Sequence, residues 1–180
     1  MLKILFLDTE TRARVDISAG TDRYTRAAEC RIVTYAFETE PAKLWLPYQD
    51  PLPPRDFTGA LSDHMLVAHN AAFDRLILAR ALGMYTPLAS WFCTMACASA
   101  HGLPGSLEAL GAICGLTAEE AKLVDDKGLI NTFCVPQAAT GKFIEPHEAP
   151  EEWARFCAYA IRDTEALRAI YNKIPKHNYA

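Results

Sequence analysis

A short apolar run followed by two carboxylates sets the first constraint on how this chain folds. Residues 4–7 read Ile-Leu-Phe-Leu, and Asp8 and Glu10 follow with a threonine between them. Such a run is typical of a strand buried inside a sheet, and side chains two positions apart in a strand share one face. Asp8 and Glu10 are therefore predicted to point off the end of the sheet into one site, where their hard oxygen atoms suit Mg²⁺ or Mn²⁺. An ordinary turn after a strand is the alternative as long as the pair stands alone.

Composition and charge narrow the class of protein. The 180 residues are 51% hydrophobic and 22% charged, which is ordinary for a globular protein, and we expect a single domain over residues 1–180. A net charge of −4 argues against a protein that holds nucleic acid mainly through a basic surface. A polyanionic substrate would therefore need metal ions to supply positive charge.

Cysteine spacing and the N-terminus indicate the cellular compartment. The six cysteines form neither a Cys-x-x-Cys pair nor the dense pattern of a secreted scaffold, so they are predicted to be free thiols. The N-terminus has no signal-peptide pattern, and no apolar run approaches the ~18 residues that a membrane span needs. We expect a soluble cytoplasmic protein with no membrane partner.

Four further segments carry the apolar, β-branched or alternating patterns that predict strands. They are residues 31–38, 42–46, 65–68 and 91–94. The first two would form a meander with the N-terminal strand. The polar stretch over residues 11–29 is predicted to be a loop with a weak strand at residues 15–18, and its arginines either meet a phosphate backbone or are solvated charges. These arginines are Arg12, Arg14, Arg23 and Arg26.

Helices are predicted where apolar residues recur at helical spacing or where capping residues stand. They cover residues 57–63, 71–82, 94–101 and the stretch from Ser106 to Gly115, and a capping box at Thr117 and Glu120 opens another. Asn70 is placed to cap the second of them, and Asp74 lies just over one turn further on. Residues 135–149 are predicted to be a loop.

The last helix has the clearest pattern in the chain. Pro150 starts it, and an apolar stripe follows at helical spacing. The stripe consists of Trp153, Phe156, Ala160, Leu167 and Ile170. Tyr159 and Asp163 are four residues apart, so they lie one above the other along the edge of the stripe. A carboxylate at this edge needs a partner, because burying it alone is costly.

Three pairs of polar residues stand on three fitting elements. They are Asp8 and Glu10 after the first strand, Asn70 and Asp74 after a later strand, and Tyr159 and Asp163 on the last helix. In this order and at these spacings they resemble the three motifs of the DEDD (DnaQ-like) 3′-5′ exonucleases, in the tyrosine subclass. Within that superfamily the chain looks most like the proofreading exonuclease domain of family A, bacteriophage-type DNA polymerases. Shared stretches are residues 8–11, 69–73, 93–95, 101–107, 128–130 and 150–153, whereas Thr164 replaces an expected small apolar residue.

The resemblance implies a ribonuclease H-like α/β fold, with a mixed central sheet of about five strands flanked by helices. It also implies a 3′-5′ exonuclease that hydrolyses DNA to nucleoside monophosphates with two divalent ions, Mg²⁺ or Mn²⁺, and that acts in proofreading. Asp8 would bridge both ions, and Glu10 and Asp163 would hold the ion that carries the nucleophilic water. Asp74 would support the other ion. Four carboxylates in one site repel each other, so without metal some should stay protonated.

The remaining roles concern Tyr159 and the substrate. The unperturbed pKa of tyrosine, about 10, makes Tyr159 a poor base, so it would orient the water by hydrogen bonding. Thr9, Asn70 and Phe73 border the motif carboxylates and are expected to contact the substrate, although Asn70 also suits a helix cap. The expected partners are single-stranded or frayed DNA 3′ ends and a polymerase domain or subunit. The expected location is the cytoplasm, or the host cytoplasm if a phage encodes the chain.

Two other functions stay open at this point. One is an RNA-processing exonuclease of the same subclass, which tolerance of the 2′-hydroxyl would distinguish. The other is a catalytically silent module that binds nucleic acid or a partner protein, against which the complete set of motif residues argues. Several nearby side chains are more ordinary: His69 is expected to be packed, Cys93 and Cys97 to be core residues and not a zinc pair, and Trp45, Trp91 and Trp153 to be core residues.

Overall fold

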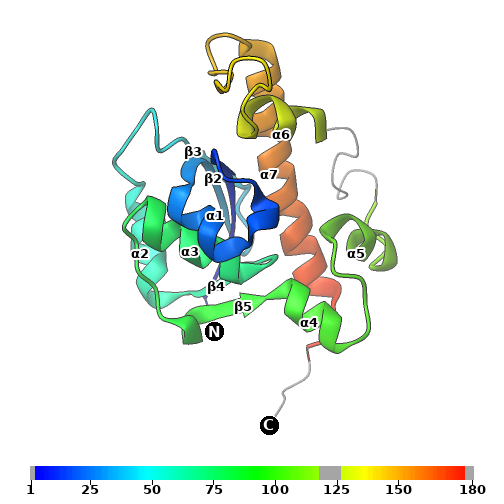
Figure 1. Cartoon of the computed structure of the whole chain (residues 1–180). Helices are drawn as coiled ribbons and strands as arrows, with labels where there is room; N and C mark the ends of the chain where they lie inside the picture. Colours follow the sequence, from blue (N-terminus) through cyan, green and yellow to red (C-terminus); the bar gives the residue numbers. More distant parts are fainter. Residues whose placement is uncertain (1–2, 118–126, 177–180) are drawn as a thin grey trace.

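The computed structural model describes residues 3–117 and 127–176, which fold around one five-stranded sheet (Figure 1). Its strands are β1 (Ile4–Arg12), β2 (Glu29–Phe37), β3 (Lys43–Trp45), β4 (Met65–Ala68) and β5 (Trp91–Cys93). The strand order is β3-β2-β1-β4-β5; β1 and β3 pair with β2 antiparallel, whereas β4 pairs with β1 and β5 in parallel. The predicted mixed sheet of about five strands and its early meander are confirmed.

The two faces of β1 pack against different helices. Leu5 and Leu7 belong to a buried cluster with residues of α2 (Arg55–Asp63) and α3 (Ala71–Ala81). Phe6, between them, packs instead with Leu167 and Tyr171 of α7 (Pro150–Lys173). This alternation follows from the pleat of a strand, and it decides which helix each later residue of β1 faces.

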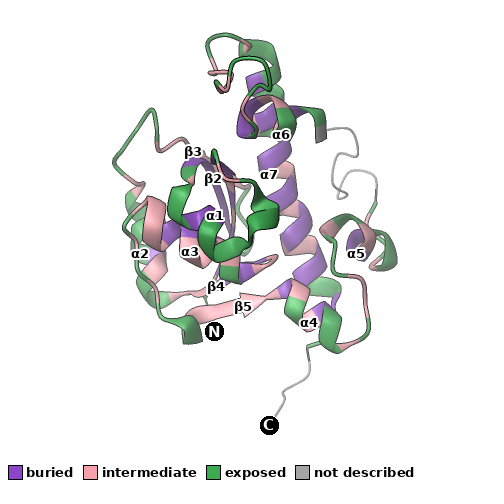
Figure 2. Ribbon diagram, in the orientation of Figure 1, coloured by how far each residue is buried: buried purple, intermediate pink, exposed green. Residues whose placement is uncertain are grey.

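Helix α7 runs along the sheet (Figure 1), and buried segments recur along its length (Figure 2). All five stripe residues are buried, and Pro150 occupies the first turn as predicted. Thr164, which replaces the small apolar residue expected from the resemblance, has a hydrogen-bonding partner. Its side chain is fully buried, and its hydroxyl oxygen lies 2.7 Å from that of Thr34 on β2. A threonine is therefore accommodated here by a hydrogen bond between helix and sheet, because a buried hydroxyl is costly only when unpaired.

The other helices agree with the sequence in part. They are α1 (Thr21–Ala27), α4 (Thr94–Ala100), α5 (Leu107–Ile113) and α6 (Lys127–Cys134), with the short 3₁₀ helices η1 (Ile17–Ala19) and η2 (Leu88–Ser90). Ser106 caps α5 as predicted, since its hydroxyl accepts a hydrogen bond from the backbone N–H of Ala109. The predicted capping box at Thr117 and Glu120 extends outside the described residues. Residues 135–149 contain neither helix nor strand, as predicted.

The prediction of a loop over residues 11–29 is wrong. Strand β1 continues to Arg12, and η1 and α1 follow in place of the weak strand. Helix α1 has only seven residues, and its N-cap Gly20 makes no side-chain hydrogen bond, so the capping signal that marks the start of a helix is missing. Tertiary contacts hold it instead: Tyr24 is buried beside Phe73 of α3, with ring centroids 5.9 Å apart.

Three of the four arginines of this stretch have assigned partners. Arg12 is 8% exposed and pairs with Glu29 and Glu145, so the alternative of a solvated charge is wrong for it. Arg26 pairs with Asp22, and Arg14 donates to the carbonyl of Gly141. All six cysteines are free thiols, as predicted. Among the helices of the described residues, none combines the length and the apolar character that crossing a membrane requires.

Candidate active site

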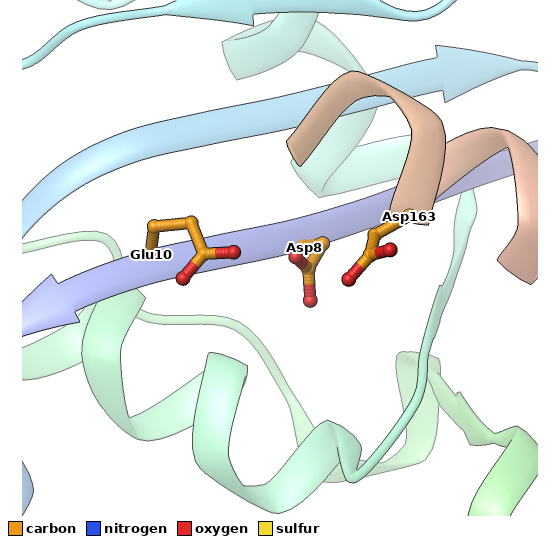
Figure 3. Close-up of side chains that lie close together, drawn as sticks. All are labelled: Asp8, Glu10 and Asp163. Carbon is orange, nitrogen blue, oxygen red and sulfur yellow. The ribbon is translucent and has the colours of Figure 1, made fainter. Parts of the chain in front are cut away.

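Three carboxylates meet between β1 and α7. Asp8 and Glu10 come from the strand, Asp163 comes from the helix, and one oxygen atom of each lies within 4.8 Å of the others. Figure 3 shows Asp8 between the other two side chains. The prediction that Asp8 and Glu10 share a face of β1 is confirmed. Both lie on the same face as Phe6, which packs against α7.

The position of this cluster differs from the predicted end of the strand. Strand β1 runs two residues past Glu10, so the two carboxylates lie within it. They lie beyond the pairing of β1 with β4, however, which stops where Phe6 is opposite Val67. The cluster therefore lies past the carboxyl end of β4, next to the part of β1 that is not paired with β4.

Asp74 is not part of this three-carboxylate group. Thr9 points to the opposite face of β1 and donates a 2.7 Å hydrogen bond from its hydroxyl to Oδ1 of Asp74, which is 2% exposed. Burial, and then the negative charge of Asp8, raise the pKa of Asp74 well above its ordinary value. Asp74 thus lies within electrostatic reach of the cluster, although a different side chain orients it.

Tyr159 lies one helical turn before Asp163 and is almost fully buried. Burial raises the pKa of its phenol far above the usual value, and the charges of Asp163 and Glu10 and a hydrogen bond with Asp163 act in the same direction. The phenol therefore keeps its proton at neutral pH. Its ring stacks on Phe156, with centroids 6.1 Å apart, which fixes the direction of the hydroxyl group.

Asn70 occupies the predicted N-cap position of α3 but does not cap it with its side chain. Its backbone is in the left-handed region, with φ of 69° and ψ of 48°. A side-chain cap requires an extended backbone at this position, so the predicted capping hydrogen bond is wrong. Asparagine is among the few residues that tolerate the left-handed conformation, and this conformation turns the chain from β4 into α3.

A pocket of about 420 Å³ lies next to the cluster, with Thr9 and Glu10 in its wall. Its apolar lining includes Ile17, Tyr24, Phe73, Ile130 and Val135. The volume and the apolar walls with a few polar groups are typical of a site for a small organic group. Of the three residues expected to contact substrate, Thr9 and Phe73 line this pocket, whereas Asn70 is not among its lining residues.

Sequence reasoning missed most of this lining. Ile17 and Tyr24 lie on η1 and α1, within the stretch predicted to be a loop, and Val135 follows α6. The one available signal was the presence of apolar side chains in an otherwise polar stretch. The Tyr24 hydroxyl lies 3.1 Å from the hydroxyl oxygen of Thr11, which ties this wall to β1.

His69 has the packing role that the sequence suggested. Its Nε2 lies 2.7 Å from the carbonyl oxygen of Gly105, which can only accept, so Nε2 carries a proton. Its Nδ1 lies 2.9 Å from the Thr94 hydroxyl oxygen, which donates to it when the ring is neutral. His69 therefore links the end of β4 to the start of α4 and to the chain before α5.

The cluster fits divalent cations such as Mg²⁺ or Mn²⁺. Its donors are all carboxylate oxygens, which hard cations prefer, and carboxylates this close repel each other unless a cation or a proton lies among them. Asp8, Glu10 and Asp163 are the residues that would hold such an ion.

Mg²⁺ or Mn²⁺ should therefore raise the melting temperature of the protein. An ion that binds only the folded state stabilises it by about 2.7 kcal/mol at 100 times Kd, which corresponds to roughly 5–10 °C here. Because the folded-state pKa of Asp74 is raised, the contribution of Asp74 to the stability of the metal-free protein is greatest below the ordinary pKa of an aspartate and is lost as the pH rises through the raised pKa. The metal-induced increase should thus be larger at pH 8 than at pH 5. Melting curves with EDTA and with millimolar metal test this, and identical curves would contradict a metal site.

Two comparisons with known proteins indicate the family. A family model described as 3′-5′ exonuclease matches residues 7–177. The chain is 35% identical to the DNA polymerase of Bacillus phage SP02 over 185 residues, which cover 97% of this chain and 28% of the polymerase. The chain therefore spans less than a third of that relative.

Two solved structures show the likeness in fold. Trypanosoma brucei RNase D in complex with RNA U12 has a TM-score of 0.59 and 16% identity, over 99% of this chain and 57% of that one. Brucella melitensis NrnC has a TM-score of 0.55 and 14% identity, over 96% of this chain and 72% of that one. The ribonuclease H-like α/β fold predicted from the sequence is confirmed.

Proposed function

The chain belongs to the 3′-5′ exonuclease family, and we propose that it hydrolyses DNA from the 3′ end and releases nucleoside monophosphates. The observation that carries this proposal is the group of Asp8, Glu10 and Asp163 beside a largely apolar pocket. The acidic group suits the reacting phosphate and its metal ions, and the pocket suits a nucleoside. Because the acidic group and the pocket are adjacent, they support hydrolysis of the terminal phosphodiester bond of a DNA strand.

The metal-binding residues proposed are Asp8, Glu10, Asp74 and Asp163. Two divalent ions bound there would lower the pKa of a water molecule and stabilise charge on the attacking and leaving oxygens of the phosphodiester. Asp8 lies between the other two carboxylates of the cluster, which supports its role as the shared ligand. Thr9 orients the carboxylate of Asp74, which supports a positioning role for this hydroxyl in addition to its place in the pocket wall.

Tyr159 is proposed to orient the attacking water by a hydrogen bond. Its phenol keeps its proton, because burial and the neighbouring carboxylates raise its pKa. A protonated phenol donates a hydrogen bond and cannot act as the general base at neutral pH. The stacking of its ring on Phe156 supports a fixed direction for that donor.

The pocket is proposed to hold the terminal nucleoside. Tyr24 and Phe73 offer aromatic surfaces for a base, and base stacking on such rings is tolerant of sequence. An enzyme that takes a terminal nucleotide away from its stack should prefer single-stranded or frayed ends, because less pairing energy is lost. This preference is the physical basis of proofreading.

DNA as the substrate and proofreading as the role are supported by the relative that is a DNA polymerase. We propose that the chain is a single exonuclease domain that acts beside a polymerase domain or subunit, in the cytoplasm of the cell that contains it. The RNA-bound structure with a similar fold favours the alternative of an RNA-processing enzyme. The two substrates differ by the 2′-hydroxyl, so one experiment separates them.

Single-stranded DNA and RNA of one sequence, each labelled at the 5′ or the 3′ end, test the function. We expect the 3′ label to be released first as a mononucleotide, and DNA to be degraded at least about tenfold faster than RNA. Duplexes with a mismatched 3′ terminus should be cut faster than matched ones. Faster degradation of RNA would favour the RNA-processing role, and equal rates on matched and mismatched ends would count against proofreading.

A further inference from the structure

The irregular residues 135–149, here the 135–149 segment, are held in place by several specific contacts. Within the segment, the backbone N–H of Gly141 donates to the carbonyl of Gln137 at 2.7 Å, and the N–H of Gln137 donates to the carbonyl of Lys142 at 2.8 Å. Arg14 donates from Nη1 to the carbonyl of Gly141 at 2.7 Å. The segment is therefore an ordered part of the molecule, although it contains no helix or strand.

One carboxylate of the segment, Glu145, joins it to two strands. Its Oε1 accepts from Nη1 of Arg12 on β1 at 2.7 Å, and its Oε2 accepts from Nη2 of Arg31 on β2 at 2.9 Å. Both arginines are buried, at 8% and 6% exposure. Although burial alone would raise it, the pKa of Glu145 is lowered, since Arg12 donates a hydrogen bond and both guanidinium groups attract the carboxylate.

The two arginines are themselves fixed by the sheet and by aromatic rings. In the pairing of β1 with β2, Glu10 is opposite Ile32 and Thr11 is opposite Cys30, so Arg31 is the extra residue of a bulge. A bulge redirects a side chain. The guanidinium of Arg31 lies 4.0 Å from the ring centroid of Tyr48, and that of Arg12 lies 4.7 Å from the centroid of Phe143. Loss of the Glu145 charge would remove the anion that the two buried cations share and leave Arg12 with Glu29, which is unfavourable because both guanidinium groups are buried.

The start of the same segment forms part of the proposed nucleoside pocket. Val135 and Pro136 line it, directly after Ile130 and Cys134 of α6. A second hollow of about 790 Å³, which Glu145 lines, shares Ala13 and Arg14 with this pocket. A shift of the segment would therefore change the shape of the pocket without moving the carboxylate cluster.

We propose that Glu145 is a positioning residue that holds the 135–149 segment against β1 and β2, so that Val135 and Pro136 form a fixed wall of the nucleoside pocket. This inference rests on the proposed function of that pocket. Glu145 would then affect how tightly the substrate binds and leave the chemical step unchanged. No contact of Glu145 with Asp8, Glu10 or Asp163 is needed for this role.

Glu145→Gln tests the proposal, because it keeps the size of the side chain and removes its charge. With single-stranded DNA and Mg²⁺, we expect KM to rise roughly tenfold while kcat stays within about twofold, since displacement of a substrate-contacting wall weakens ground-state and transition-state binding together. Inhibition by the product dTMP should weaken by a similar factor. Trypsin should also cut faster after the exposed Lys142, because the segment is held less firmly.

Glu38→Gln is the matched control, since Glu38 is exposed and lies outside the segment. It should leave KM, kcat and the trypsin rate unchanged. An unchanged KM in Glu145→Gln, or a fall in kcat alone, would overturn the inference even if trypsin cleavage became faster. If Glu145→Gln does not fold, Glu145→Asp, which keeps the charge but shortens the reach, decides by the same criteria. An unmutated protein that does not degrade DNA would instead refute the proposed function.

Discussion

Asp8→Ala should lower the rate of DNA hydrolysis by more than about a thousandfold while leaving the fold intact. Asp8 lies between Glu10 and Asp163, and its negative charge also raises the pKa of Asp74. Its loss would disrupt the proposed positions of both ions. Removal of one of several repelling carboxylates should also leave the metal-free melting temperature unchanged or raise it, because active sites sacrifice stability for function.

Two measurements separate these effects. Nuclease assays at constant Mg²⁺ give the loss in rate, and melting curves in EDTA give the stability of the metal-free protein. Glu38→Ala, at an exposed position away from the cluster, should keep its activity within about twofold. Activity of Asp8→Ala within tenfold of the unmutated protein would refute the assignment of this site.

Tyr159→Phe should lower the rate roughly ten- to a thousandfold, about the effect of losing one aligned polar group in a catalytic site. The substitution removes the hydroxyl and keeps the ring that stacks on Phe156. The pH profile gives the sharper test. Burial and the neighbouring carboxylates raise the pKa of Tyr159 far above neutrality. Its ionisation therefore cannot produce the rising limb of the rate profile, which is the range near neutral pH over which the hydrolysis rate increases with pH. The limb should therefore persist in Tyr159→Phe at a lower rate, and it should move toward lower pH when Mn²⁺ replaces Mg²⁺.

Tyr35→Phe provides a control of the same chemistry. Tyr35 is also buried, and its hydroxyl donates to Asp56 at 3.0 Å on the other face of the sheet. Its loss should reduce stability by about 1 kcal/mol and leave the rate profile unchanged. Disappearance of the rising limb in Tyr159→Phe, with no response to the metal, would identify Tyr159 as the general base.

Much of the fold could be predicted because its signals are local. The buried strands are apolar runs, and α7 has a long stripe at helical spacing, so β4 and the start of α7 coincide with their predictions. The shared face of Asp8 and Glu10 follows from strand geometry alone. The family predicted from the three motifs is confirmed by the match over residues 7–177.

What the sequence did not reveal depends on partners far along the chain. Asp74 was predicted from its motif, but its hydrogen bond with Thr9, 65 residues away in the chain, could not be predicted. Glu145 meets arginines that are 133 and 114 residues away, and no local pattern marks such a pair. Helix α1 lacks a side-chain cap, so its stability comes from packing on α3, which periodicity does not detect.

The alternation along β1 also limits how the gene for this chain can change. Insertion or deletion of a single codon before Asp8 would exchange the two faces of the strand, and would direct Asp8 and Glu10 toward α3 and Thr9 toward α7. We therefore expect selection to eliminate insertions and deletions within β1, even where the inserted residue is chemically similar to its neighbours. Surface loops tolerate added residues far better, so variation in length among relatives should collect in the connections between elements.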